Sequence, residues 1–188
     1  MVEFSDVNKR FGEKTVLSGF THRFAANKTT VIRGESGRGK TTLLRLAAGL
    51  ELPDIGIVTV AGRVVFVFQE DRLLPQISAV KNLRICSSLS VKQAEDLLKE
   101  FSLHQDDITA PVRELSGGMA RRVALARGLA ANGDVLLLDE PFRGLDDDNR
   151  KRAADTVKRH AVGKTILLVT HDIDDMALFP ECELFDMD

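Results

Sequence analysis

The strongest chemical signal in the chain is a short run of glycines that ends in lysine and threonine. Residues 34–41 read Gly-Glu-Ser-Gly-Arg-Gly-Lys-Thr and match the spacing G-x-x-x-x-G-K-[ST] at every fixed position. Glycines let backbone N–H groups point inward at an anion, because no Cβ stands in the way. Lys40 then brings a mobile charge to the β and γ phosphates of a nucleotide, and the Thr41 hydroxyl ligates Mg²⁺. We therefore predict a phosphate-binding loop; the alternative is a Gly-rich turn that holds no ligand.

A second candidate site lies where an aliphatic run ends in two acids. Val135 to Leu138 is followed at once by Asp139 and Glu140. In an open α/β sheet, ligands bind at the carboxyl ends of the strands. Asp139 is therefore predicted to hold Mg²⁺ through water, and Glu140 to polarise the water that attacks the γ-phosphate. Taken alone, the pair reads equally well as a solvated turn before Pro141, and the phosphate loop is what favours catalysis.

The elements that position these residues alternate between short aliphatic runs and helical patterns. Thr29 to Arg33 reads as a strand before the loop, and residues 43–50 keep leucines on one face of a helix after it. Runs without alternation suit strands buried on both faces, as in parallel sheets covered by helices. Further strands are expected at 57–60, 64–68, 135–138 and 165–169, with helices over 119–131 and 146–161. The expected fold class is therefore α/β.

The bulk composition describes an ordinary globular protein. The 188 residues are 44% hydrophobic and 29% charged, with a net charge of −2. This balance argues against disorder and against nucleic acid as a partner, because phosphate neutralisation needs clustered Lys and Arg. Cys86 and Cys182 fit no metal pattern and suggest a reducing compartment.

The sequence also contains no candidate membrane-spanning segment. No apolar run reaches the ~20 residues of a membrane-spanning helix. The apolar character of Met1 to Phe4 is interrupted by the charge of Glu3, so we expect no signal peptide. The expected location is the cytoplasm, with no direct lipid insertion, and any work at a membrane then goes through another subunit.

Leu115-Ser116-Gly117-Gly118-Met119, just upstream of the acidic strand, separates this chain from most other phosphate-loop proteins. With this signature, the sequence resembles the ATP-binding subunits of ABC transporters along essentially its whole length. The resemblance implies ATP and Mg²⁺ as cofactors. A Gly-Gly pair at a helix start also makes physical sense, since bare N–H groups and a positive dipole end attract an anion. Met119 replaces the usual Gln and leaves the phosphate contact to Ser116 and the backbone.

Other positions then match the family in its order. Gln69, after the strand at 64–68, matches the Q-loop glutamine that touches the metal and the attacking water. His171 matches the switch histidine that contacts the γ-phosphate, and Asp146 matches the D-loop aspartate. Phe11 stands where the family usually has a Tyr that stacks on adenine; stacking needs only the ring face. A residue of any of these types, taken alone, is more often an ordinary surface or core residue. The assignment to site roles therefore depends on the order in which they occur.

The resemblance thus implies a full set of site residues. The catalytic residues are Glu140, His171 and Gln69, and the metal ligands are Thr41, Asp139 and Gln69. The nucleotide-binding residues come from the aromatic position, the phosphate loop, the signature and the D-loop: Phe11, Gly34, Glu35, Ser36, Gly37, Arg38, Gly39, Lys40, Thr41, Thr42, Ser116, Gly117, Gly118, Met119 and Asp146.

The resemblance also implies an architecture. We expect a P-loop NTPase core with a largely parallel sheet flanked by helices, a small N-terminal antiparallel β part and an inserted helical subdomain. Residues 1–188 would form a single ABC ATPase domain, with the nucleotide-binding core at 1–69 and 116–188 and the insert at 70–115. Within the insert, Ser90 and Gln93 have the form of a capping box that opens a helix to about Phe101.

The implied partners are a second ABC ATPase chain and an integral-membrane permease. In the family, two copies form a head-to-tail dimer around two ATP, with Ser116 and the following amides of one copy closing on the γ-phosphate held by Lys40 of the other. The permease is expected to dock near the Q-loop and the helical subdomain. The protein would then lie at the cytoplasmic face of the membrane.

The role within the family leaves alternatives open. The segment from Gln69 to Pro75 resembles importer ATPases of the nitrate, sulfonate and taurine group, which favours ATP hydrolysis that drives solute import. One alternative is a non-transport ABC ATPase of the iron–sulfur assembly, cell-division or lipoprotein-release type. The other is a module that binds ATP without hydrolysing it, and the intact Lys40, Asp139, Glu140 and His171 argue against that.

Overall fold

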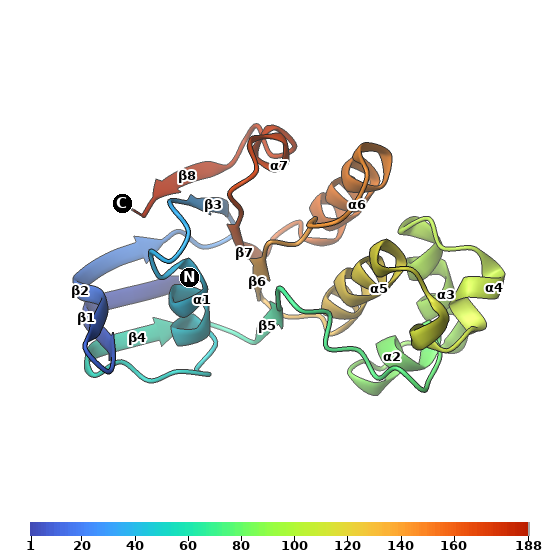
Figure 1. The fold of residues 1–188 in the computed structure, drawn as a ribbon, viewed down its shortest axis with the longest axis horizontal. Helices are drawn as coiled ribbons and strands as arrows, with labels where there is room; N and C mark the ends of the chain where they lie inside the picture. The colour runs from blue at the N-terminus through green and yellow to red at the C-terminus, as the bar shows by residue number, and fades with distance from the viewer. Residues whose placement is uncertain (188) are drawn as a thin grey trace. The chain divides into compact units, whose positions relative to one another are not determined.

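The computed structural model describes residues 1–187, which form two compact units. The first unit contains residues 1–66, 133–139 and the chain from Gly163 onward, and the second contains residues 67–132 and 140–162. Figure 1 shows that the first is rich in strands and the second is helical. Among the described residues, no helix combines the length and the apolar character that a membrane span requires.

An antiparallel sheet opens the first unit. Its central strand β1 (Val2–Phe11) lies between β2 (Lys14–Phe24) and β4 (Ile55–Val60) (Figure 1). Val2 and Phe4 of β1 are buried and Glu3 between them is more accessible, as expected where one face of a sheet packs on the core. The small N-terminal antiparallel part predicted from the family resemblance is therefore confirmed.

A five-stranded sheet is the second sheet of the first unit. Its strand order is β5 (Val64–Val67), β6 (Val135–Asp139), β7 (Thr165–Val169), β3 (Thr29–Arg33) and β8 (Glu183–Asp186). The pairs among β6, β7, β3 and β8 are parallel. All residues of β6 and β7 are buried, which explains their unbroken aliphatic sequences. Two helices belong to this unit, α1 (Lys40–Ala47) and the short α7 (Ile173–Ala177).

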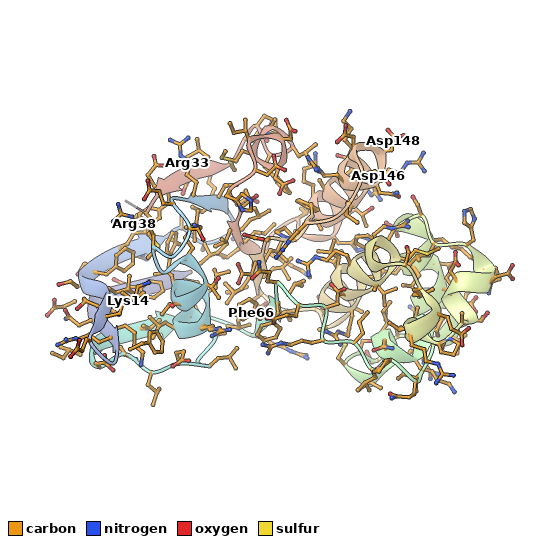
Figure 2. All side chains as sticks on the ribbon, in the orientation of Figure 1. Lys14, Arg33, Arg38, Phe66, Asp146 and Asp148 are labelled. Carbon is orange, nitrogen blue, oxygen red and sulfur yellow. The ribbon has the colours of Figure 1, made fainter. Side chains whose placement is uncertain are left out.

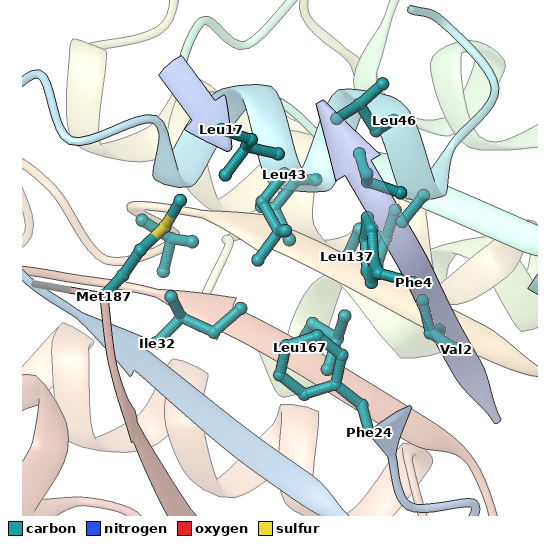
Figure 3. Packing of buried hydrophobic residues seen from close by; sticks show 14 of the residues in the cluster. Val2, Phe4, Leu17, Phe24, Ile32, Leu43, Leu46, Leu137, Leu167 and Met187 are labelled. Carbon is teal, nitrogen blue, oxygen red and sulfur yellow. The ribbon is translucent and has the colours of Figure 1, made fainter. Parts of the chain in front are cut away.

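The core of the first unit joins its two sheets and α1. Phe4 of the antiparallel sheet, Leu43 of α1, and Leu137 and Leu167 of the parallel sheet are all fully buried in one cluster (Figure 3). Burial of one such side chain stabilises the fold by ~1.5–3 kcal/mol. The segment between β3 and α1 is therefore held at both ends by elements anchored in the core.

The second unit is built from helices α2 (Ala79–Ile85), α3 (Val91–Glu100), α4 (Gln105–Thr109), α5 (Gly117–Ala130) and α6 (Asp147–His160), with a 3-10 turn at Val112–Glu114. Its own buried side chains include Leu83, Leu98, Phe101, Ile108 and Leu125. The capping box predicted at Ser90 is present, since its Oγ accepts the Gln93 N–H at 3.2 Å and the Gln93 side chain accepts the Ser90 N–H at 2.9 Å.

The α/β fold class is confirmed, with two helix boundaries corrected. The helix expected over residues 43–50 ends at Ala47, because Gly49 adopts a left-handed φ of 68° just after it. The helix expected over 119–131 begins earlier, at Gly117. The reason is that the Ser116 side chain accepts the Met119 N–H at 3.3 Å and so acts as the N-cap. The assignment of residues 70–115 as an insert stays a prediction, and the compact helical unit also contains α5 and α6.

Candidate nucleotide site

The predicted phosphate loop connects β3 to α1 and depends on two glycines. A Cβ at Gly34 would lie 2.6 Å from the Met187 carbonyl oxygen, and a Cβ at Gly39 would lie 2.4 Å from Val16 Cγ1. Gly39 also has φ 98°, in the left-handed region that side chains avoid, and α1 starts directly after it. No side chain caps α1. Its first N–H groups are therefore available to an anion.

Lys40 lies inside this loop. The residue is buried, and its Nζ donates hydrogen bonds of 2.7 Å to the carbonyl oxygens of Gly34 and Glu35. The backbone thus holds the ammonium group under the loop that would wrap a phosphate chain. By contrast, Glu35 and Arg38 point outward, form an ion pair of 3.8 Å and are largely exposed.

The carboxyl edge of the parallel sheet collects the other predicted residues of this unit. Asp139 pairs in register with Val169, and Val169 pairs with Ile32, which is two residues before Gly34. The loop after β3, the end of β6 and the turn that carries His171 after β7 therefore meet at one edge. Asp139 is buried there and His171 is exposed. This is the edge at which open α/β sheets bind ligands.

The donor set at this edge fits Mg²⁺. Thr41, in the first turn of α1, offers a hydroxyl oxygen, and Asp139 offers a carboxylate. Residues 1–187 contain no group of three or more His, Cys, Asp or Glu that could hold a metal ion by themselves. Mg²⁺ that binds with a nucleotide does not need such a group, because one or two protein oxygens join phosphate oxygens and water.

A cavity of about 460 Å³ lies beside the loop in the first unit. Lys14 of β2 and Arg38 of the loop, both labelled in Figure 2, contribute to its lining together with Val16, Phe20 and Met187. Phe11, the predicted adenine-stacking residue, is not part of that lining. It ends β1 with 46% exposure, and Lys9 Nζ lies 5.1 Å from its ring centroid. Stacking on adenine stays a prediction.

Glu140 and Gln69, two of the predicted catalytic residues, are in direct contact in the second unit. Gln69 Nε2 donates a hydrogen bond of 3.0 Å to Glu140 Oε2. The two residues follow β5 and β6, which are neighbours in the sheet order. Glu140 has φ 45°, a left-handed conformation that is rare for residues other than glycine and is concentrated at functional sites. The strained backbone supports the catalytic assignment, which stays a prediction.

Arg121 is a residue of this site that the sequence analysis missed. Its side chain is buried, and its guanidinium donates to the carbonyl oxygens of Phe68, Glu140 and Pro141 at 2.7 to 2.8 Å. A buried arginine is costly unless its donors are satisfied, so this one is built into the fold. Its only sequence signal is an arginine on the apolar part of a helix, which no motif singles out.

The signature residues form the exposed start of α5. Ser116 is the N-cap, and Gly117 and Gly118 make the first turn, with open space around the position of a Cβ at Gly117. Asp146 likewise caps α6: its carboxylate accepts the backbone N–H and the side-chain amide of Asn149 at 2.9 and 2.7 Å. These bonds, together with the charge of Arg122, hold the pKa of Asp146 below its usual value.

The predicted site residues thus fall into two groups, one in each unit. In the first unit, Phe11, the phosphate loop, Asp139 and His171 belong to one fold, and the last three meet at one sheet edge. In the second unit, Gln69 contacts Glu140, while the signature and Asp146 cap two helices. A phosphate cradle at the carboxyl edge of a parallel sheet defines the class of P-loop nucleotide-binding proteins.

Comparison with known proteins places the chain within that class. The family model described as ABC transporter matches residues 17–143. The chain belongs to this family, as one of its ATP-binding ATPase subunits.

Two curated relatives have the same type of name. The aliphatic sulfonates import ATP-binding protein SsuB 3 of Rhodococcus jostii (strain RHA1) is 43% identical over 93% of the chain, which spans 66% of that relative. SsuB 1 of Nocardia farcinica (strain IFM 10152) is 42% identical, again over 93% of the chain, which spans 73% of that relative.

Solved structures agree on the fold. A dimeric structure of the bacterial ABC transporter cassette MJ0796 matches with a TM-score of 0.88 and 26% identity, over 100% of this chain and 95% of that one. A dimeric post-hydrolysis state of the same cassette, bound to ADP and Pi, matches with a TM-score of 0.84 and 28% identity, over 95% and 91% of the two chains.

Proposed function

We propose that the chain is the motor subunit of an ABC importer and that it hydrolyses ATP to drive solute uptake through a membrane permease. The observation that carries the proposal is the phosphate loop, with Lys40 held under it by two carbonyl oxygens and a free helix start after Gly39. The contact between Gln69 and Glu140 adds groups that can orient a water molecule.

Each residue then has a role in binding or hydrolysis. Lys40 and the backbone N–H groups of the loop balance the charge of the β and γ phosphates, and Thr41 and Asp139 hold Mg²⁺. Magnesium supplies charge neutralisation between the phosphates when bound. Glu140 accepts the proton of the attacking water, Gln69 keeps the Glu140 carboxylate in place, and His171 donates to the γ-phosphate.

The signature at the start of α5 is proposed to act on a second copy of the chain. Ser116 and the exposed amides after it make an anion site that lies far from the phosphate loop in sequence. Dimeric cassettes are among the similar solved structures. In a head-to-tail dimer, this site completes the nucleotide site of the partner. Asp146 would lie near the same dimer interface.

The imported solute is proposed to be an aliphatic sulfonate or a related small anion. The support is the 42–43% identity to the sulfonate import proteins. The segment 69–75 and the helical unit are the proposed docking face for the permease, because Gln69 to Pro75 resembles the Q-loop region of importer ATPases. The ATPase would then work at the inner face of the membrane through that partner.

A mixing experiment tests the shared nucleotide site. Ser116→Arg should bind ATP normally but not hydrolyse it, whereas Lys40→Ala should fail to bind, because the counter-charge of the phosphates is lost. When the two variants are mixed, one site of each mixed dimer has both elements intact, so hydrolysis should rise above that of either variant alone. Hydrolysis by Ser116→Arg alone at the wild-type rate would contradict the proposal.

A further inference from the structure

Arg121 uses its guanidinium to hold together two separate stretches of backbone. Nη1 donates to the carbonyl oxygen of Phe68 at 2.7 Å and more weakly to that of Gln69 at 3.3 Å. Nη2 donates to the carbonyl oxygen of Glu140 at 2.8 Å, and Nε donates to that of Pro141 at 2.8 Å. Arg121 therefore binds the main chain on both sides of the contact between Gln69 and Glu140.

The loop after Gln69 is fastened to the same helix by other bonds. Asp71 accepts from Arg121 Nη1 at 3.2 Å. Arg127, two turns further along α5, donates to the carbonyl oxygens of Asp71 and Arg72 at 2.9 and 2.7 Å. The Arg72 guanidinium in turn lies over the Phe68 ring, 3.8 Å from its centroid. Four of the five residues 68–72 are thus bonded to α5: Phe68, Gln69, Asp71 and Arg72.

Glu140 needs such a support because its backbone is strained. A left-handed φ of 45° is unfavourable for a residue with a Cβ, and the α region is further disfavoured before proline. The two bonds from Arg121 to Glu140 and Pro141 oppose relaxation of this conformation. If the backbone relaxed, the Glu140 carboxylate would turn away from the Gln69 amide.

We propose that Arg121 is the positioning residue that keeps Gln69 and Glu140 in contact and that ties both of them to the signature helix. Ser116 caps the same helix one and a half turns before Arg121. A movement of the signature onto a partner's nucleotide would therefore pull on the water-orienting pair of its own chain. This inference rests on the proposed ATPase function and assigns to Arg121 the link between the signature helix and the catalytic pair of the same chain.

The chemistry of the side chain explains why arginine is needed. A guanidinium presents five N–H donors in one rigid plane, and here four carbonyl oxygens and one carboxylate lie around it. Lysine has three donors on a single nitrogen and cannot reach both stretches in this geometry. Glutamine has two donors and a shorter stem, so it can hold at most one stretch.

The test compares Arg121→Gln with Arg159→Gln in the full chain. Arg159 lies on α6 in the same unit and bonds Glu100 and Thr156 instead of the catalytic pair, so it controls for the loss of an arginine away from that pair. Arg121→Gln should lower kcat about tenfold or more while the Kd for ATP changes less than about twofold, because only the geometry of the pair is disturbed. Arg159→Gln should keep both values.

A double variant separates positioning from general loss of stability. If Arg121 acts by keeping Gln69 and Glu140 in contact, then the loss of kcat in the double variant Arg121→Gln, Gln69→Ala should be smaller than the product of the two single fold losses. Fold losses that multiply would overturn the proposal. Hydrogen exchange of residues 68–72, which does not depend on turnover, should be faster in Arg121→Gln than in Arg159→Gln, and equal exchange would also overturn it.

The same experiment distinguishes this inference from the proposed function. If wild-type protein neither binds nor hydrolyses ATP, the proposed function fails whatever Arg121 does. If wild-type protein turns over ATP and the Arg121→Gln variant matches the Arg159→Gln control, only the positioning role fails. Rescue of kcat by Arg121→Lys would contradict the geometric argument, because a lysine cannot span both stretches.

Discussion

The two compact units position their functional groups in different ways. In the first unit, backbone conformation makes the site: glycines that exclude a Cβ, a helix start without a side-chain cap, and strand ends in register. In the second unit, side chains make it: the buried Arg121 and the partly buried Arg127 bind backbone carbonyl oxygens and fix the loop that carries Gln69. The chain passes between the two units at four peptide bonds, one of which is the bond between Asp139 and Glu140.

This contrast indicates that the two tasks of the enzyme, binding ATP and directing a water molecule, depend on different parts of the chain. Binding a phosphate chain needs many N–H groups directed at one point, which a backbone turn supplies without mobile side chains. Directing a water molecule needs a carboxylate at a defined angle, which requires support from neighbouring side chains. Changes in the first unit should therefore affect ATP binding, and changes around Glu140 should affect turnover.

A large effect on ATP affinity is expected at Gly39, and the opposite end of the same helix offers a control. Gly39→Ala and Gly49→Ala both place a Cβ on a left-handed backbone, with φ of 98° and 68°, and each should lower the free energy of unfolding by ~1–2 kcal/mol. A Cβ at Gly39 also meets Val16 at 2.4 Å, whereas Gly49 has open space. Only Gly39→Ala should lose ATP affinity, by about tenfold or more, because charged phosphate contacts are worth ~1.5–3 kcal/mol each.

Titration calorimetry with ATP and chemical denaturation of both variants provide the two measurements. Equal ATP affinity in Gly39→Ala and Gly49→Ala would break the contrast between the units, because the loop backbone would then not be what binds the phosphates. Unchanged stability of both variants would instead contradict the left-handed backbone conformations of Gly39 and Gly49.

A smaller effect is expected in the helical unit at the cap of α3. Ser90→Ala removes the side-chain acceptor of the Gln93 N–H and should lower the free energy of unfolding by ~1 kcal/mol. Ser88→Ala, two residues earlier and outside the capping box, should leave it nearly unchanged. ATP binding should be the same in both variants. A loss of ATP affinity in Ser90→Ala would show that the two units are not separable in this way.

The smallest effect is a dependence of stability on pH at His22. Burial lowers the pKa of His22 below its usual 6.5, although Glu183 opposes this, and its ring contacts those of Phe24 and Phe185. The unfolded chain therefore binds the proton more readily, so stability is full above pH 6.5 and falls as the pH drops towards the folded pKa. The loss should be small, because solvent screens a partly exposed ring. Denaturation curves at several pH values should show a weaker acid-side loss in His22→Gln.

Much of the first unit could be predicted from the sequence. The strand at 165–169 was predicted at its observed bounds, and the phosphate loop was predicted with its flanking strand and helix. These features are local, because glycine spacing and unbroken aliphatic runs encode backbone conformation directly. The first strands β1 and β2 came from the family resemblance alone, since their alternation is interrupted by register shifts.

The support of Glu140 could not be predicted. Arg121 and Glu140 are 19 residues apart, and the bond between them ends on a backbone oxygen, which has no residue identity that a motif could record. The same holds for Arg127 and the carbonyl oxygens of Asp71 and Arg72. The start of α5 was misplaced for a local reason: Ser116 caps the helix and lets two glycines form its first turn, although glycine disfavours helices.

The most direct test of the central claim is Glu140→Gln, which changes the second unit and leaves the phosphate loop intact. An amide cannot accept the proton of the attacking water, so turnover should fall by on the order of 10²-fold or more while ATP still binds. Gel filtration with ATP and Mg²⁺ should then show a dimer that is absent with ADP, because hydrolysis no longer opens it. Wild-type turnover by Glu140→Gln, without an ATP-dependent dimer, would contradict the account.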